Sequence, residues 1–234
     1  MCSSDLLKHI KGMQSAPQLP LAVDVARWQG EPVAMVVAQT RALAEDAVQL
    51  IEADYEALPA VTNIETALDA ATPVIHPQLG SNLCFERFID SGKVDEVFAK
   101  ADKVVEATFT TSRHTPVSLE TRTMLADFNA PEGLLTVWHS TQVPYMMQWI
   151  IAHHYGLAEN NVRVIAPDVG GAFGMKIHTY GDDMATVAAA LATGRPVKFV
   201  ADRLESFVSD FHARGHRVKV RCAVSNAGDM LGFE

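Results

Sequence analysis

A run of glycines between a strand-like and a helix-like segment constrains this chain more than any other feature. Residues 168–176 read Asp-Val-Gly-Gly-Ala-Phe-Gly-Met-Lys, with three glycines in five positions. Residues 162–166 before the run are typical of a strand, and residues 180–193 after it are typical of a helix. Glycine permits tight turns and lets the backbone approach a ligand closely. A strand, a glycine loop and a helix in this order also direct unpaired N–H groups toward an anion, although a tight turn alone would equally explain the glycines.

The glycine spacing excludes both common nucleotide-binding motifs. A P-loop needs four residues between its first glycine and a Gly-Lys pair that Ser or Thr follows, whereas Ile177 follows Lys176. The dinucleotide fingerprint G-x-G-x-x-G does not fit Gly170, Gly171 and Gly174 either. The loop therefore suits an oxygen-rich anionic ligand that is recognised in another way.

Periodicity divides the chain into two blocks. In the first block, residues 32–38 form an apolar run that suits a buried strand, and Thr40 is a candidate N-cap for a helix. Residues 51–55 alternate like a second strand, so this part is predicted to be a β–α–β unit. Residues 72–80 are rich in turn formers and are interpreted as a linker.

The second block mixes strands and helices, and the whole chain is predicted to be α+β. We expect an antiparallel strand pair on either side of Ala130-Pro131-Glu132. Residues 217–222 alternate strictly, which places three basic side chains on one face of a strand, most simply a solvated face. The predicted strands are 103–111, 123–129, 133–140 and 217–222, and the predicted helices are 93–101 and 145–156.

Four further stretches accompany the glycine loop in a fixed order. They are residues 27–34, residues 45–46 with 51–61, the pair Leu119-Glu120-Thr121 and Ser140-Thr141-Gln142, and residues 195–197 with 202–203. With the loop, they resemble the molybdenum hydroxylases, the family of xanthine dehydrogenase, aldehyde oxidase and aerobic carbon monoxide dehydrogenase. The resemblance covers roughly residues 18–234.

The resemblance implies a domain organisation. Residues 7–80 are expected to be the C-terminal part of an α/β hammerhead-like domain with its linker, and residues 81–234 the first part of a molybdopterin-binding domain. Residues 1–6 read like a translated sequencing adapter and are interpreted as an artefact. Large subunits of this family are several times longer, so we expect an internal fragment that is inactive by itself.

The resemblance also implies a cofactor and the residues around it. The cofactor is molybdenum on molybdopterin, expected in its cytosine dinucleotide form, and no side chain of this chain is expected to ligate the metal directly. Gln142 would donate a hydrogen bond to an oxygen ligand of the metal, and the Gly174 backbone would lie beside it. The alternative for Gln142 is a cap on the helix that starts near Val143-Pro144. The expected cofactor-binding residues are Gln142, Gly170, Gly171, Ala172, Phe173 and Gly174.

The family's catalytic general base is a glutamate expected beyond Glu234, so no catalytic residue is assigned here. Glu120 is interpreted as structural. Phe173, Met175 and Ile177 are expected to line the substrate channel. Ile177 stands where xanthine dehydrogenases carry a glutamate that binds the purine, which argues against a purine substrate.

The predicted activity is hydroxylation of an aldehyde or an N-heteroaromatic ring with oxygen derived from water. One alternative is the large subunit of a carbon monoxide dehydrogenase, whose characteristic cysteine loop would also lie beyond Glu234. An alternative from another class is a degenerate module that binds partners without catalysis.

The resemblance implies partner proteins as well. Electrons would pass to [2Fe–2S] clusters and FAD on partner subunits or domains, in a dimer of heterotrimers that acts on a small molecule. A net charge of −9 argues against nucleic acid as a partner. No stretch approaches the roughly 20 apolar residues that cross a bilayer. Three scattered cysteines do not suggest a disulfide framework, so the expected location is the cytoplasm.

Overall fold

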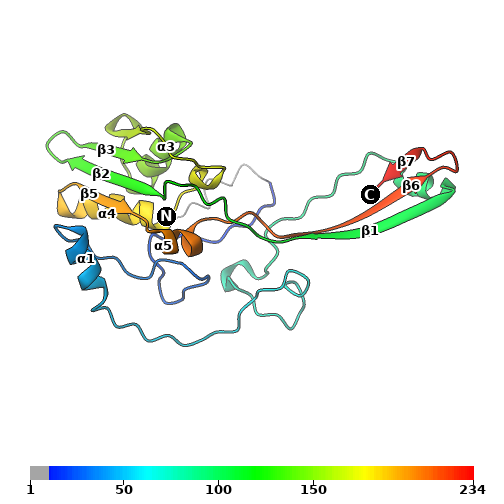
Figure 1. The fold of residues 1–234 in the computed structure, drawn as a ribbon, viewed down its shortest axis with the longest axis horizontal. Coiled ribbons are helices and arrows are strands. Elements are labelled where there is room, and N and C mark those ends of the chain that lie inside the picture. The colour runs from blue at the N-terminus through cyan, green and yellow to red at the C-terminus, as the bar shows by residue number, and fades with distance from the viewer. Residues whose placement is uncertain (1–10) are drawn as a thin grey trace. The chain divides into compact units, whose positions relative to one another are not determined.

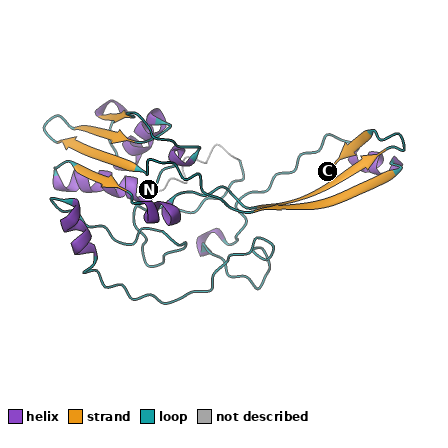
Figure 2. Cartoon of the chain, in the orientation of Figure 1, coloured by secondary structure: helices purple, strands orange, loops and turns teal. Residues whose placement is uncertain are grey.

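The computed structural model describes residues 11–234, so the segment 1–6 that was interpreted as an artefact lies outside the described residues. The chain divides into two compact units, drawn as a ribbon in Figure 1 and by secondary structure in Figure 2. One unit comprises Met1–Cys84 and Thr115–Phe211, and the other comprises Phe85–His114 and His212–Glu234. This grouping differs from the predicted boundary at residue 80, which stays a prediction.

The first unit contains a four-stranded sheet in the order β4-β3-β2-β5. β2 pairs antiparallel with β3 and with β5, as expected for two runs on either side of a tight turn, and β3 pairs parallel with β4. The strands are β2 (Thr123–Asn129), β3 (Leu134–His139), β4 (Val162–Ile165) and β5 (Val197–Val200). The predicted strand pair at 123–129 and 133–140 is confirmed.

Two helices, α3 (Pro144–Tyr155) and α4 (Gly181–Thr193), pack on one face of this sheet (Figure 1). The strand side chains that face them alternate with exposed or half-buried ones, as the period of two requires. The Tyr155 hydroxyl joins the two helices by donating to the Met184 carbonyl at 2.5 Å. The fully buried apolar core consists of Met124, Ala126, Leu135, Val137, Met147, Ile150, Ile151, Val187 and Ala190.

The N-terminal part of this unit contains the α-helix α1 (Arg41–Val48). Thr40 caps it as predicted, because its hydroxyl accepts a hydrogen bond from Leu43 N at 3.3 Å. The strands predicted at 32–38 and 51–55 are absent from the described chain, so the β–α–β prediction is wrong apart from its helix. An extended segment becomes a strand only by pairing with a neighbour, and neither segment pairs with a strand here.

Shorter elements complete the first unit. The N-terminus of helix α5 (Arg203–Ser209) is capped by Asp202, whose carboxylate accepts from Glu205 N at 2.7 Å. The 3₁₀ helices of the described residues are η2 (Pro77–Leu79), η3 (Glu159–Asn161) and η4 (Met175–Ile177).

The second unit is a three-stranded antiparallel sheet in the order β1-β6-β7, with one helix, α2. In the predicted basic stripe on β6, Arg217 and Lys219 are exposed and Arg221 is half-buried, and two of the three residues pair with acidic residues. Lys219 Nζ lies 2.8 Å from Glu106, and Arg221 lies 2.8 Å from Glu234. The elements are α2 (Val94–Lys100), β1 (Lys103–Thr111), β6 (His216–Val224) and β7 (Met230–Phe233).

Over residues 11–234, no helix is both long enough and apolar enough to cross a membrane.

Candidate cofactor site on the glycine loop

The glycine loop leaves β4 and exposes a row of backbone donors. Gly171 and Gly174 have φ of +95° and +87°, and Phe173 has φ of +52°, whereas Ala172 is not in the left-handed region. Within the part of the chain that the structure describes, the N–H groups of residues 171–173 have no hydrogen-bond acceptor. Successive N–H groups in alternating backbone conformations form a concave site that attracts anions. The loop therefore offers the backbone donors that an oxygen-rich ligand requires. Residues 170–174 also carry no acidic side chain that would repel such a ligand.

The Ser140-Thr141-Gln142 segment lies beside this loop because each residue is fixed by its own hydrogen bonds. Ser140 joins the end of β2, since its Oγ accepts from Thr123 N at 3.0 Å. The Thr141 hydroxyl donates to the Lys176 carbonyl at 3.1 Å, and Gln142 N donates to the same carbonyl at 3.1 Å. These bonds fix Gln142 against the end of the loop.

The orientation of the Gln142 amide follows from its partner. Its side-chain oxygen accepts a hydrogen bond from Gly174 N at 3.1 Å, and a backbone N–H can face only an acceptor. The amide NH2 therefore points elsewhere, and no described residue accepts from it. Gln142 does not cap α3, because Val143 is the N-cap residue and its N–H bonds to the Thr141 hydroxyl instead. The capping alternative is thereby ruled out.

The three residues predicted to line a substrate channel differ in accessibility. The Phe173 side chain is 76% exposed, so it does not fill the core of the described chain, and Ile177 is 39% exposed. Met175 is only 2% exposed, because its side chain turns into the protein at the start of η4. Phe173 and Ile177 are therefore open to solvent and Met175 is not, and the substrate channel stays a prediction.

Phe173 is a backbone outlier as well as an exposed aromatic residue. An L-residue with a bulky side chain rarely adopts φ of +52°, and such conformations cost of order 1–3 kcal/mol. They persist where the surrounding structure dictates them, and they cluster at ligand sites. The Phe173 ring is thus exposed to solvent, next to the unpaired N–H groups of the loop, in a backbone conformation that is unfavourable for this residue.

An ion pair between a buried lysine and a half-buried glutamate supports the loop. Lys176 is only 2% exposed, and its Nζ lies 2.6 Å from Glu120 Oε2. The same carboxylate oxygen accepts from Gly170 N at 2.9 Å, and Glu120 N donates to the Gly170 carbonyl at 3.1 Å. A Cβ on Gly170 would lie 2.6 Å from the Glu120 Cβ, so the close contact requires glycine at this position. The structural role expected for Glu120 is confirmed by these contacts.

A second buried network, centred on Arg122, lies under the start of α4. The Arg122 guanidinium, 1% exposed, bonds both carboxylate oxygens of Asp182, with Nη2 to Oδ2 at 2.6 Å. It also bonds Asp210 at 2.6 Å and the Ser209 hydroxyl at 2.9 Å. Burial opposes the charge of Arg122, but its carboxylate partners outweigh that effect and raise its pKa above the ordinary value. Arg122 therefore joins β2 to α4 and to the end of α5.

Tyr180 connects the Arg122 network to the glycine loop. Its ring lies under the guanidinium, 3.8 Å from ring centroid to Cζ, and its hydroxyl donates to the Met175 carbonyl at 2.9 Å. Burial raises the pKa of Tyr180 well above its usual value, so the phenol keeps the proton that it donates.

The N-terminus of α4 is occupied by protein groups. Asp183, which is fully buried, accepts from Tyr180 N at 3.3 Å and faces the His139 imidazole at 3.4 Å. Although burial opposes its charge, His139 and the other partners lower the pKa of Asp183. The carboxylates of Asp182 and Asp183 already stand in the first turn of this helix, so we place the anion-binding donors in the loop.

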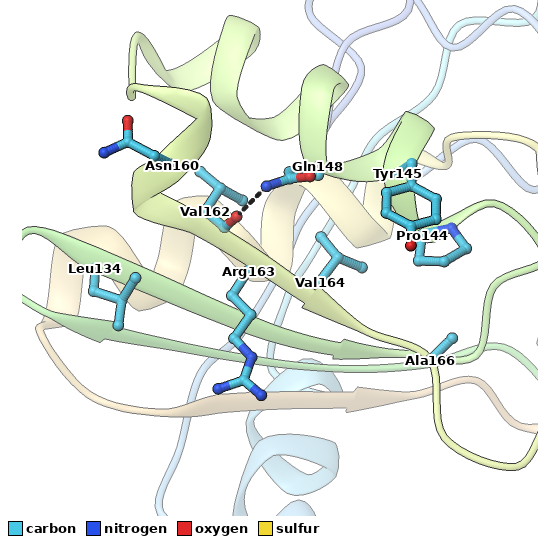
Figure 3. Close-up of a pocket in the computed structure, with 9 residues that line it drawn as sticks. All are labelled: Leu134, Pro144, Tyr145, Gln148, Asn160, Val162, Arg163, Val164 and Ala166. Carbon is cyan, nitrogen blue, oxygen red and sulfur yellow. Dashed lines mark hydrogen bonds between the residues drawn. The ribbon is translucent and has the colours of Figure 1, made fainter.

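A hollow beside α3 is separate from the glycine loop. A hollow of about 440 Å³ lies between the first turns of α3, η3 and β4, with Gln148 bonded to the Val162 carbonyl at 2.7 Å (Figure 3). None of the residues predicted for the cofactor or substrate lines it. The candidate site is accordingly the exposed group formed by Gln142 and the loop.

Comparison with known proteins shows the family of the chain. Residues 75–234 match the family described as the molybdopterin cofactor-binding domain. Residues 2–59 match the a/b hammerhead domain of aldehyde oxidase and xanthine dehydrogenase. The chain therefore belongs to the aldehyde oxidase and xanthine dehydrogenase family of molybdenum enzymes, and most of it is a molybdopterin-binding domain.

Three individual proteins are similar to this chain over nearly its whole length. The chain is 34% identical to the nicotine 6-hydroxylase large subunit of Paenarthrobacter nicotinovorans, over 98% of this chain and 29% of that one. It is 33% identical to the carbon monoxide dehydrogenase large chain of Afipia carboxidovorans, over 97% and 30% of the two chains. Its structure resembles quinoline 2-oxidoreductase of Pseudomonas putida 86 with a TM-score of 0.88 and 33% identity, over 100% and 31%. The chain spans about three tenths of the length of these relatives.

Proposed function

We propose that this chain forms part of the molybdenum-binding large subunit of a hydroxylase, and that Gln142 and residues 170–174 contact the cofactor. The observation that carries the proposal is the arrangement of donors beside the loop. The Gln142 oxygen accepts from Gly174 N, and no described residue accepts from its amide NH2 or from the backbone N–H groups of residues 171–173. Among the described residues, this is a site made of uncharged donors.

The donor set fits an oxygen-rich, anionic cofactor. Amide and backbone N–H groups donate without bringing a positive charge of their own, so they can stabilise oxygen atoms while leaving the redox properties of a metal to its own ligands. The two glycines with left-handed φ also keep Cβ atoms away from the approach to these N–H groups. When bound, the molybdenum cofactor would supply the oxygen insertion and the two-electron redox chemistry.

The residues of this chain would then have separate roles. The Gln142 NH2 would donate to an oxygen of the cofactor and fix its orientation. The Gly174 backbone would lie beside the cofactor, because its N–H holds the Gln142 carbonyl. The Phe173 ring would border the channel through which the substrate arrives, and Ile177 would form an apolar part of the wall.

The substrate that this wall favours is an N-heteroaromatic ring or an aldehyde. An aliphatic side chain at position 177 cannot hydrogen-bond to a purine, and each buried polar atom left unpaired costs about 1–3 kcal/mol. Two relatives carry names of N-heteroaromatic chemistry, nicotine 6-hydroxylase and quinoline 2-oxidoreductase. Carbon monoxide remains the second candidate substrate, because the carbon monoxide dehydrogenase large chain is 33% identical to this chain.

We further propose the cytosine dinucleotide form of the cofactor, and partner subunits or domains that carry FAD and [2Fe–2S] clusters. The proposal places the enzyme in the cytoplasm as a dimer of heterotrimers. Support for partners comes from relatives whose names describe one chain of a complex, such as a large subunit or a large chain.

Substrate choice is the first test of this function. For the intact enzyme, we expect kcat/KM for quinoline or benzaldehyde to exceed that for xanthine, by about tenfold for each unpaired purine atom. Replacing Ile177→Glu should shrink the ratio by restoring a polar partner, whereas Ile64→Glu on the exposed N-terminal segment should leave it unchanged. Steady-state assays with the three substrates and with carbon monoxide decide the matter. A wild-type preference for xanthine would contradict the proposed substrate class.

A further inference from the structure

The glycine loop and Gln142 belong to a closed circuit of hydrogen bonds. Gln142 accepts from Gly174 N at one end and donates through its own N–H to the Lys176 carbonyl at the other. Lys176 continues through its side chain to Glu120, and Glu120 returns to the loop at Gly170. Every contact in the circuit is 3.1 Å or shorter. The orientation of the Gln142 amide therefore depends on where Lys176 and Glu120 hold the two ends of the loop.

Glu120 and Lys176 are held in place by burial and by hydrogen bonds. The Lys176 ammonium is taken out of water, and a buried cation is tolerated only when it is paired and hydrogen-bonded. Glu120 is itself fixed from its other side, because Arg203 donates to the carbonyls of Ser118 and Leu119 at 2.7 and 2.8 Å. A flexible lysine on the surface could not hold a loop in this way, since it would exchange its partner for water.

We infer that Lys176 and Glu120 are positioning residues for the reaction: through the loop, they set the direction in which the Gln142 NH2 points. This inference rests on the proposed function, since it assigns a purpose to the same site. The sequence pattern marks Lys176 only as the residue after the glycine loop. Its burial and its link to Gln142 are features of the structure.

The inference predicts that Lys176 acts only through Gln142, which a double-mutant cycle measures. In the intact holoenzyme, Lys176→Met should lower kcat per bound molybdenum by about 10–100-fold, the range found when groups that orient metal ligands are removed. Combined with Gln142→Ala, Lys176→Met should add at most about twofold, because the orientation it sets no longer matters. KM should change less than kcat in both backgrounds.

A second readout follows the loop without using activity. Hydrogen exchange of the peptide that contains residues 168–176 should be faster in Lys176→Met, since the Gly170 and Gly174 amides lose their fixed acceptors. Glu120→Ala should give the same increase, and Glu120→Gln should restore much of the protection because its side-chain oxygen still accepts from Gly170 N and Lys176. If Lys176→Met does not fold, the two Glu120 variants make the same comparison. The matched control is Lys219→Met, which removes an exposed lysine paired with Glu106 in the other unit.

The outcomes separate this inference from the proposed function. Variants of Gln142 with wild-type kcat would overturn the proposed function. Loss of activity in Gln142→Ala together with an independent, multiplicative effect of Lys176→Met would overturn only the positioning role. Wild-type kcat per molybdenum in Lys176→Met, or unchanged exchange of the loop in that variant, would also overturn it.

Discussion

Replacing Gln142→Ala in the intact holoenzyme should lower kcat by about 10²–10³ while molybdenum and pterin contents stay near those of the wild type. The reason is geometric: Gln142 is exposed beside the loop, its oxygen is bonded to Gly174 N, and its amide nitrogen has no acceptor among the described residues. Removal of one preorganised donor at a reacting centre typically costs this much in rate. Steady-state kinetics with metal analysis of the same preparation provides the measurement.

Replacing Gln142→Glu gives the sharper version of this test. A glutamate can still accept from Gly174 N, as the wild-type amide oxygen does at 3.1 Å, but it has no NH2 to donate. We expect this variant to be as impaired as the alanine variant. Gln148→Ala, which loses two bonds to backbone carbonyls outside the site, should keep kcat near the wild-type value. Near-normal turnover in the glutamate variant would mean that Gln142 only supports the loop.

Replacing Arg122→Met should have the largest effect on stability, about 3–5 kcal/mol of unfolding free energy, the usual result of removing one partner of a buried ion pair. The variant leaves Asp182 and Asp210 without their cation, and Asp210 is almost fully buried. Urea unfolding followed by circular dichroism would measure the change in midpoint. The same substitution also removes the guanidinium that covers the Tyr180 ring.

Two further variants test whether the loss of stability in Arg122→Met comes from the buried charges. Arg41→Met removes an exposed helical pair with Glu45, and because solvent screens such a pair, its loss should change the unfolding free energy far less. The triple variant Arg122→Met, Asp182→Asn, Asp210→Asn should recover part of the stability, because it removes the uncompensated charges. A single Arg122→Met variant as stable as Arg41→Met would contradict the structural role assigned to the network.

Local sequence patterns predicted an element of the fold well where that element depends mainly on residues close to it in the chain. The strands predicted at 103–111 and 123–129 are β1 and β2 of the structure, and the helix predicted at 145–156 is α3, four of whose apolar side chains are buried. The strand predictions for residues 32–38 and 51–55 were wrong because a strand depends on residues elsewhere in the chain. Their pattern describes a preference for extended backbone, but a strand also needs a partner, and these segments find none in the described chain.

The candidate site was likewise predicted where its features are local in the sequence and missed where they depend on distant residues. The sequence marked the loop and Gln142, because glycine spacing and short motifs are local. It could not reveal that Lys176 is buried, since a lysine after a glycine loop is ordinarily solvated, and its partner Glu120 is distant in the chain. The Arg122 network was missed in the same way: Arg122, Asp182 and Asp210 come from three separate elements that only the fold brings together.

The distance from Gln142 Nε2 to the nearest oxygen of the cofactor, in a crystal structure of the intact holoenzyme, tests the central claim most directly. The account predicts a hydrogen-bond separation of about 2.7–3.2 Å, with Oε1 still bonded to Gly174 N and the cofactor facing the N–H groups of residues 171–173. A cofactor bound away from the glycine loop, with the Gln142 amide nitrogen donating to protein instead, would contradict it.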